Sequence, residues 1–128
     1  MMPMRQQILV VEDDPALRTI EYQILRKMGF EVVTLDCAEK AVRLLDEYSF
    51  DLLVTDIHLG AGLNGIDLMR MVRNQELRLK ILVISGNVHE RRTGSVETLA
   101  DGLLDKPFSI DELRANVLHV LEQAPMIG

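Results

Sequence analysis

The sequence predicts a single α/β domain in which a five-stranded parallel sheet is covered by helices on both faces. Three observations support this fold class. Short apolar runs alternate with helical patterns five times along the chain. Each run is continuously apolar, as is typical of strands that are buried on both faces. The length of 128 residues is that of one ordinary domain. We therefore expect one folded unit over residues 1–128, with its core between about residues 8 and 123.

The five expected strands are rich in Val, Ile and Leu. They are residues 8–11, 32–35, 52–55, 81–84 and the weaker run 103–104. Each run is short enough for a strand and too short for a typical helix. Because a helical pattern separates each strand from the next, consecutive strands form βαβ units and pair in parallel.

The first helix is the clearest one. Asp14 suits its N-cap, Pro15 suits its first turn and Gly29 ends it. We place five apolar residues on its inner face: Leu17, Ile20, Ile24, Leu25 and Met28. The outer face is expected to carry Arg18, Glu21 and Arg26.

Two further helices are expected over residues 38–48 and 66–73, each with one apolar face. The segment 88–100 is the weakest helical pattern, because Gly94 interrupts it and few large apolar residues anchor it, so we expect a marginal, mobile helix there. The last helix begins with a capping box, Ser109 to Glu112, and its expected inner stripe is Ile110, Leu113, Val117 and Leu121.

Composition narrows the class of partner. The formal net charge is −6 and only 4% of residues are aromatic, which argues against a nucleic-acid-binding surface.

No apolar run approaches the roughly 20 residues that span a bilayer, and the start lacks a signal-peptide pattern, so we expect a cytoplasmic protein without a membrane contact. The single cysteine, Cys37, favours no redox or metal role. A protein partner is the remaining expectation.

Acidic residues stand where two expected strands end. Glu12 and Asp13 follow the first strand and Asp56 follows the third. Parallel strands bring their carboxyl ends to one edge, where open α/β sheets bind ligands. A carboxylate such as Asp56 can attack phosphorus if the negative charge is neutralised, and Mg²⁺ prefers oxygen ligands of this kind. The cluster therefore predicts either Mg²⁺ or a shared proton.

Two more polar residues follow strands at the same edge. Ser85 follows the fourth strand and Lys106 the fifth, so a hydroxyl and an ammonium would meet the oxygens of a phosphoryl group. In isolation Ser85 would rather start a turn and Lys106 would be a solvated charge, but their positions at this edge favour the functional interpretation. Asp14 is interpreted as a helix cap outside the metal site.

These residues resemble the receiver domains of two-component response regulators. The resemblance covers residues 8 to about 123 and is carried by Ile8-Leu9-Val10-Val11-Glu12-Asp13-Asp14, Asp51-Leu52-Leu53-Val54-Thr55-Asp56, Ser85-Gly86 and Lys106-Pro107-Phe108. It implies a flavodoxin-like sheet of strand order 2-1-3-4-5. It also implies phosphorylation of Asp56 by a histidine kinase or phosphotransfer protein, slow Mg²⁺-dependent autodephosphorylation as the only catalytic activity, and signalling to a downstream protein through a binding surface.

The resemblance also assigns roles within the site. It implies that Asp13 and Asp56 bind Mg²⁺, that Glu12 does so directly or through water, and that the backbone carbonyl of His58 completes the protein ligands. Ser85 and Lys106 would contact the phosphoryl group. The resemblance further implies a cis peptide bond between Lys106 and Pro107.

The sequence departs from the family pattern in three places. Leu103 stands where many relatives have Tyr or Phe, which removes an aromatic rotamer switch. Gly60 stands where proline is common. The loop 56–65 is one residue longer than the commonest version and contains Gly60, Gly62 and Gly65, so we expect it to be flexible.

Two other functions stay open at this point. A small-molecule phosphohydrolase or phosphotransferase could use Asp56 as its nucleophile, since aspartate nucleophiles occur in such enzymes on α/β folds. A receiver-like binding module that works unphosphorylated is the other possibility. The sequence leaves open the oligomeric state, the kinase, the target and whether an effector domain belongs to the same protein.

Overall fold

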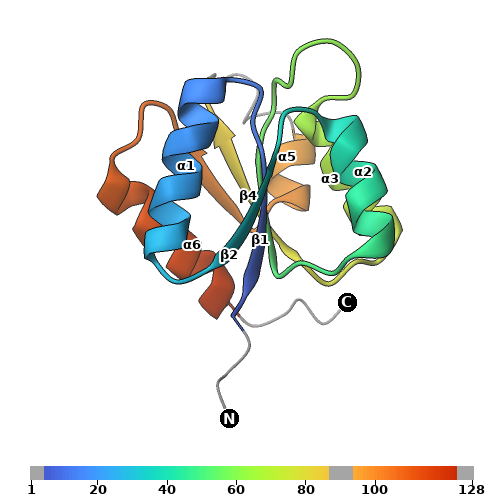
Figure 1. Cartoon of the computed structure of the whole chain (residues 1–128). Coiled ribbons are helices and arrows are strands. Elements are labelled where there is room, and N and C mark those ends of the chain that lie inside the picture. The colour runs from blue at the N-terminus through green and yellow to red at the C-terminus, as the bar shows by residue number, and fades with distance from the viewer. Residues whose placement is uncertain (1–4, 87–93, 124–128) are drawn as a thin grey trace.

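A parallel sheet lies at the centre of the molecule, with helices packed on both of its faces (Figure 1). The structure is a computed structural model and describes residues 5–86 and 94–123. The strands are β1 (Gln7–Val11), β2 (Glu31–Leu35), β3 (Leu52–Asp56), β4 (Lys80–Ser85) and β5 (Gly102–Asp105). Their order is β2-β1-β3-β4-β5 with all neighbours parallel, which confirms the expected fold class and strand order.

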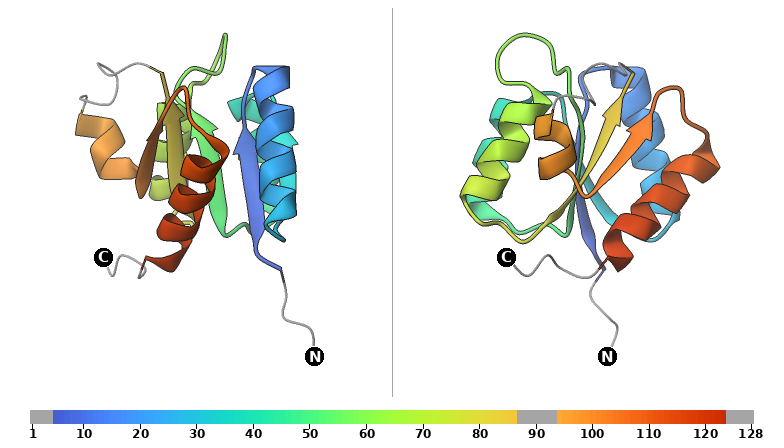
Figure 2. Two further views of the ribbon diagram at one scale, coloured as in Figure 1. Left: turned by 90° about the vertical axis from the view of Figure 1, so that its left-hand side faces the viewer. Right: turned by 180° about the vertical axis from the view of Figure 1, so that it is seen from behind.

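The described helices divide into two groups. They are α1 (Pro15–Lys27), α2 (Ala38–Glu47), α3 (Gly65–Asn74), α5 (Gly94–Leu99) and α6 (Ile110–Glu122). Helices α1 and α6 cover one face of the sheet, and α2, α3 and α5 cover the other (Figures 1 and 2). This two-sided cover explains why the strands read as continuous apolar runs.

Side chains define the beginnings of two predicted helices. The Asp14 carboxylate accepts hydrogen bonds from the backbone N–H groups of Ala16 and Leu17, as expected for the cap of α1. The Ser109 hydroxyl accepts from the N–H of Glu112, and the Glu112 side chain accepts from the N–H of Ser109. Both predicted caps are confirmed.

The weak helical pattern over residues 88–100 corresponds in part to α5. Within the described residues, α5 begins at Gly94. Residues 88–93 of the predicted segment lie outside the described residues. The prediction that this segment is mobile stays a prediction.

Alternation along the strands divides the core into two layers. Leu9, Leu53 and Ile81 face α2, α3 and α5, whereas Ile8, Val10 and Val54 face α1 and α6. The second layer continues into Glu12, because Glu12 lies two residues beyond Val10 and is buried like it. The buried layer under α1 and α6 therefore leads directly to the carboxyl edge of the sheet.

The predicted orientation is wrong for three side chains on the helices. Ile20 and Ile110 were expected to face the core, but they are 47% and 58% exposed. Glu21 was expected outside, but it is only 2% exposed. A helix turns about 100° per residue, so Glu21, three and four positions before Ile24 and Leu25, shares their buried stripe. Ile20 precedes Glu21 by one residue, so its side chain is rotated away from this buried stripe and is partly exposed to solvent.

The structure also bears on membrane contact. Within residues 5–86 and 94–123, every helix is too short or too polar to cross a lipid bilayer.

Candidate functional site

The five predicted side chains meet at the carboxyl edge of the sheet. Asp56 and Ser85 are the last residues of β3 and β4, and Glu12 and Asp13 follow β1 directly. Lys106 follows the last residue of β5. Because the strands are parallel and β1, β3, β4 and β5 are consecutive neighbours in the sheet, these ends lie side by side. The sequence-based prediction that the five residues share one site is therefore supported by the topology.

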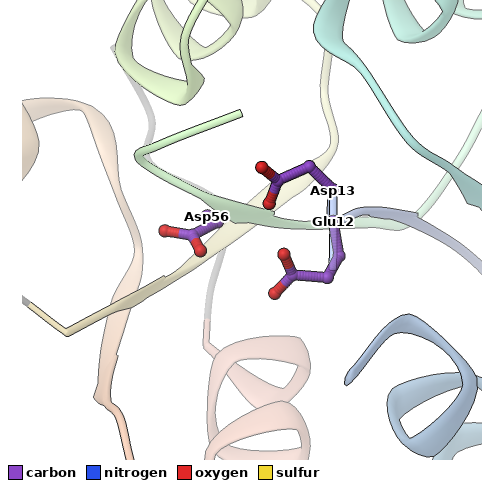
Figure 3. A group of neighbouring side chains, drawn as sticks. All are labelled: Glu12, Asp13 and Asp56. Atoms are coloured by element: carbon purple, nitrogen blue, oxygen red, sulfur yellow. The ribbon is translucent and has the colours of Figure 1, made fainter. Parts of the chain in front are cut away.

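Three carboxylates form what we call the acidic cluster: Glu12, Asp13 and Asp56. One oxygen from each lies within 4.8 Å of the others. Figure 3 shows the side chains of Glu12 and Asp13 extending toward Asp56 from the neighbouring strand end. Asp13 is exposed, whereas Glu12 is 1% and Asp56 8% exposed. The cluster thus has a buried base and an open side.

Lys106 neutralises part of this charge. Its Nζ lies 2.5 Å from Asp56 Oδ2 and 3.2 Å from Glu12 Oε1. Burial disfavours the ammonium, but the hydrogen bond to Asp56 and the attraction to both carboxylates outweigh burial, so the pKa of Lys106 is raised. Lys106 therefore stays charged at neutral pH and links two members of the acidic cluster.

Glu12 is held in place by the turn that follows β1. Its Oε2 accepts a hydrogen bond of 3.2 Å from the N–H of Asp14, and its backbone carbonyl accepts one of 2.8 Å from Arg18 Nη1. Burial raises the pKa of Glu12, although the Asp14 N–H and Lys106 oppose this effect. The turn after β1 therefore fixes both the side chain and the backbone carbonyl of Glu12.

Ser85 and Lys106 are positioned together by strand pairing. The N–H of Lys106 donates a hydrogen bond of 2.9 Å to the carbonyl of Ser85, which extends the pairing of β4 and β5 by one residue. The Lys106–Pro107 peptide bond is cis, as the family resemblance implied. Ser85 is 2% exposed and is therefore a buried residue at this edge of the sheet.

His58 lies in the loop after β3. Its N–H donates a 3.3 Å hydrogen bond to Asp56 Oδ1, which places the start of the loop against the cluster. Figure 1 shows the loop, in green, arching beyond the carboxyl ends of the strands. The predicted role of the His58 backbone carbonyl as a metal ligand stays a prediction.

The acidic cluster has the donor set of a hard divalent cation. Carboxylate oxygens are the ligands that Mg²⁺ selects, and one or two protein carboxylates suffice when water and phosphate fill the other positions. Three carboxylates this close together repel one another unless a cation or a proton is present. The residues therefore fit a Mg²⁺ site that lies beside the ammonium group of Lys106.

Sequence reasoning missed two carboxylates near this edge. Glu39, in the first turn of α2, accepts a hydrogen bond of 2.6 Å from the N–H of Leu63 in the loop after β3. Glu21 is buried on the α1 side of the sheet. Burial raises its pKa, and the negative charge of Glu12 adds to this effect. No spacing in the sequence links Glu39 to residue 63. Glu21, in contrast, could have been found from its place in the Ile24 and Leu25 stripe.

Comparisons with known proteins agree on one family. A family model described as the response regulator receiver domain matches residues 8–118. The chain is 33% identical over 119 residues to the cell cycle transcriptional regulator CtrA of Caulobacter vibrioides; the match covers 91% of this chain and 51% of CtrA.

Solved structures give the same result. A CheY-like response regulator receiver domain from Methanospirillum hungatei has a TM-score of 0.85 and 25% identity, with 93% of this chain and 95% of that chain covered. The response regulator TrrA of Thermotoga maritima, solved in complex with Mg²⁺ and BeF, has a TM-score of 0.83 and 29% identity, with 90% and 98% covered. The chain spans about half the length of the curated relatives that it matches.

Proposed function

The chain belongs to the response regulator receiver domain family, and from this premise we propose that it accepts a phosphoryl group on Asp56 with the help of Mg²⁺. The observation that carries the proposal is the geometry around Asp56. One of its carboxylate oxygens contacts Lys106 at 2.5 Å, and the acidic cluster places two further carboxylates within 4.8 Å. A nucleophile, a cation site and a permanent positive charge therefore meet at one sheet edge.

The chemistry is a phosphoryl transfer. An oxygen of Asp56 attacks the phosphorus of the donor, a new P–O bond forms, and the bond from phosphorus to the leaving group breaks. A bound Mg²⁺ would supply charge neutralisation during this step. Lys106 is placed to attract the phosphoryl oxygens, and we assign the Ser85 hydroxyl a hydrogen bond to the same group.

We assign the cation to the acidic cluster and to the backbone carbonyl of His58. Asp13 is the exposed carboxylate of the cluster and would bind the cation directly, whereas Glu12 is buried. Glu12 acts directly or through water. The donor set of the cluster, and the Mg²⁺ with which the similar protein TrrA was solved, support this assignment.

The proposal includes the partners that the family resemblance implies. A histidine kinase or phosphotransfer protein would supply the phosphoryl group, and a downstream protein would read the phosphorylated state. We propose no catalytic activity beyond the domain's own phosphorylation and autodephosphorylation. Because the chain spans only about half of its curated relatives, the output of the whole protein stays a proposal, as does a cytoplasmic location.

A small-molecule phosphohydrolase is not favoured. Family membership fits a phosphoacceptor and not an enzyme that turns over small molecules. Repeated hydrolysis of a phosphomonoester, far in excess of the protein concentration, would contradict this interpretation.

The test is intact-mass measurement after incubation with Mg²⁺ and acetyl phosphate. Wild type should gain one phosphoryl group, and the gain should disappear in Asp56→Asn and in the presence of EDTA. Asp46→Asn, which changes an exposed carboxylate on α2, is the matched control and should behave as wild type. An undiminished adduct on Asp56→Asn would refute the assignment of the phosphoacceptor.

A further inference from the structure

The loop between β3 and α3 passes directly beside the acidic cluster. Gly60 and Gly62 both have left-handed backbone angles, with φ of 75° and 95°. A Cβ atom on Gly60 would lie 3.8 Å from Asp13 Oδ2, so the backbone of Gly60 is a neighbour of that carboxylate. The conformation of this loop therefore sets part of the surroundings of any bound cation.

Both ends of the loop are fixed to the phosphoacceptor strand. The N–H of Gly65 donates a 2.8 Å hydrogen bond to the carbonyl of Ile57. A Cβ on Gly65 would lie 1.9 Å from the carbonyl oxygen of Asp56, so only glycine allows this approach. Residues 58–64 thus form a loop whose two ends both lie next to the end of β3.

Glu39 holds the C-terminal part of this loop against another element. Its Oε1 accepts a hydrogen bond of 2.6 Å from the N–H of Leu63, 24 residues away in the sequence. This hydrogen bond is the main reason why the pKa of Glu39 is lowered. A Cβ on Gly62 would lie 2.6 Å from the same oxygen, so the glycine leaves the room that the carboxylate occupies.

We propose that Glu39 is a positioning residue for the cation site: by holding Leu63, it keeps the loop, and with it the His58 carbonyl and the Gly60 backbone, in place beside the acidic cluster. This inference rests on the proposed function. Glu39 itself touches neither the cation nor the phosphoryl group. Groups that orient metal ligands commonly affect metal affinity by 10- to 100-fold.

An alternative role for Glu39 is purely local. An acidic residue in the first turn of a helix is stabilised by the helix dipole, and Glu39 has this position in α2. The two roles differ in what they require. The dipole needs the negative charge, whereas the loop needs only an oxygen that accepts a hydrogen bond from Leu63.

The experiment compares Mg²⁺ affinity by isothermal titration calorimetry in four proteins without any phosphodonor. We expect Glu39→Ala to bind Mg²⁺ about 10-fold more weakly than wild type. Glu39→Gln keeps the acceptor oxygen and should restore most of the affinity. Glu47→Ala, an exposed glutamate on the same helix, is the matched control and should bind as wild type. Hydrogen exchange at the Leu63 amide should quicken in Glu39→Ala and stay slow in Glu39→Gln.

A second variant reaches the same contact from the loop side. Gly62→Ala brings a methyl group onto Glu39 Oε1 and disfavours the left-handed backbone, so it should weaken Mg²⁺ binding in the same direction. Combined with Glu39→Ala it should cost less than the sum of the two single losses, because the clash with Glu39 disappears and only the backbone effect at Gly62 remains.

The outcomes separate the inference from the function on which it rests. Wild-type affinity in both Glu39→Ala and Gly62→Ala would overturn the inference and leave the proposed function intact. Equal losses in Glu39→Ala and Glu39→Gln would show that charge matters and not the hydrogen bond, which also overturns it. Absence of Mg²⁺ binding by wild type would overturn both.

Discussion

Glu21 is a carboxylate in an apolar layer. It is 2% exposed, its neighbours on the helix face are Ile24 and Leu25, and its Oε2 has no hydrogen-bond partner among the described residues. Burial, and secondarily the negative charge of Glu12, raises the pKa of Glu21 to about 8. At neutral pH the folded protein therefore holds Glu21 as a neutral acid.

Glu21 makes the stability of the fold depend on pH. An unfolded chain ionises this glutamate near its ordinary pKa of 4.5, whereas the folded protein keeps the proton up to about pH 8. Between these values the folded state binds one more proton, so each unit of rising pH lowers the free energy of unfolding by about 1.4 kcal/mol from this group. We expect urea unfolding between pH 5 and 9 to show this fall in wild type and a flatter dependence in Glu21→Gln.

The control for this prediction is Glu47→Gln, which changes an exposed glutamate and should keep the wild-type slope. The absolute stability of Glu21→Gln is not the readout, since the amide also needs hydrogen-bond partners in this layer. If Glu21→Gln and wild type lose stability in parallel from pH 5 to 8, Glu21 is not the group that titrates.

Residues at strand ends were predictable from the sequence, and those on helix surfaces were less so. Asp56, Ser85 and Lys106 each follow an apolar run, and parallel pairing alone brings such positions together. Glu39 acts through a loop amide 24 residues away, and that contact depends on the loop conformation. Local patterns carry no information about such a contact, which is why it was missed.

At the scale of elements, α3 is tied to the segment that joins α5 to β5. The Arg73 guanidinium donates two hydrogen bonds, of 2.7 and 3.0 Å, to the carbonyl of Leu99 and forms a 2.8 Å ion pair with Asp101. The same Asp101 oxygen accepts a 2.7 Å hydrogen bond from the N–H of Ile81 in β4. The Arg73 and Asp101 side chains together thus join the ends of α3, α5 and β4.

We expect Arg73→Met to destabilise the fold by about 2 to 3 kcal/mol, because charged hydrogen bonds are lost and the Asp101 side chain, only 5% exposed, is left without its cation. Urea unfolding measures this loss. Hydrogen exchange should quicken at Ala100 and Asp101 more than in the strands, since the bonds to Leu99 fix this segment locally.

Arg43→Met is the matched control, because Arg43 is exposed on α2. It should change stability by less than about 0.5 kcal/mol. In a double-mutant cycle, Arg73→Met and Asp101→Asn should be strongly non-additive. Additive effects, or a loss no greater than that of Arg43→Met, would mean that the ion pair contributes little.

The start signals of the elements were predictable because they are local. Asp14 with Pro15 and Ser109 with Glu112 satisfy backbone donors within three residues of themselves, so the sequence alone identifies them. The exposed positions of Ile20 and Ile110 follow instead from how each helix rotates onto the sheet, which is a tertiary property. The place of Leu103 is also a tertiary property, since it packs against the layer under α2, α3 and α5.

At the scale of the whole molecule, the alternation of strands and helices was enough to predict a parallel sheet with two covered faces. The strand order β2-β1-β3-β4-β5 was not derivable from that alternation, because several orders satisfy right-handed βαβ connections. It came from the family resemblance and is confirmed. The order matters chemically, since it makes β3 the central strand and surrounds Asp56 with residues from both sides.

The acidic cluster should make the stability of the whole fold depend on Mg²⁺. A cation that binds only the folded state adds RT ln(1 + [Mg²⁺]/Kd), about 2.7 kcal/mol at 100 times Kd. We expect the urea midpoint of wild type to rise with Mg²⁺ accordingly. Asp13→Asn removes one charge from the cluster, so it should be slightly more stable than wild type in EDTA, by about 1 kcal/mol, and less stable at high Mg²⁺.

The diagnostic result is therefore that the stabilities of wild type and Asp13→Asn, plotted against Mg²⁺ concentration, cross. A uniform difference between them would not be diagnostic. Asp46→Asn, an exposed carboxylate away from the cluster, should follow wild type at every Mg²⁺ concentration. A crossover requires that the same carboxylates repel one another without the cation and bind it when it is present. If Asp13→Asn gained as much from Mg²⁺ as wild type, the acidic cluster would not be the cation site, and charge neutralisation at Asp56 would have to depend on Lys106 alone.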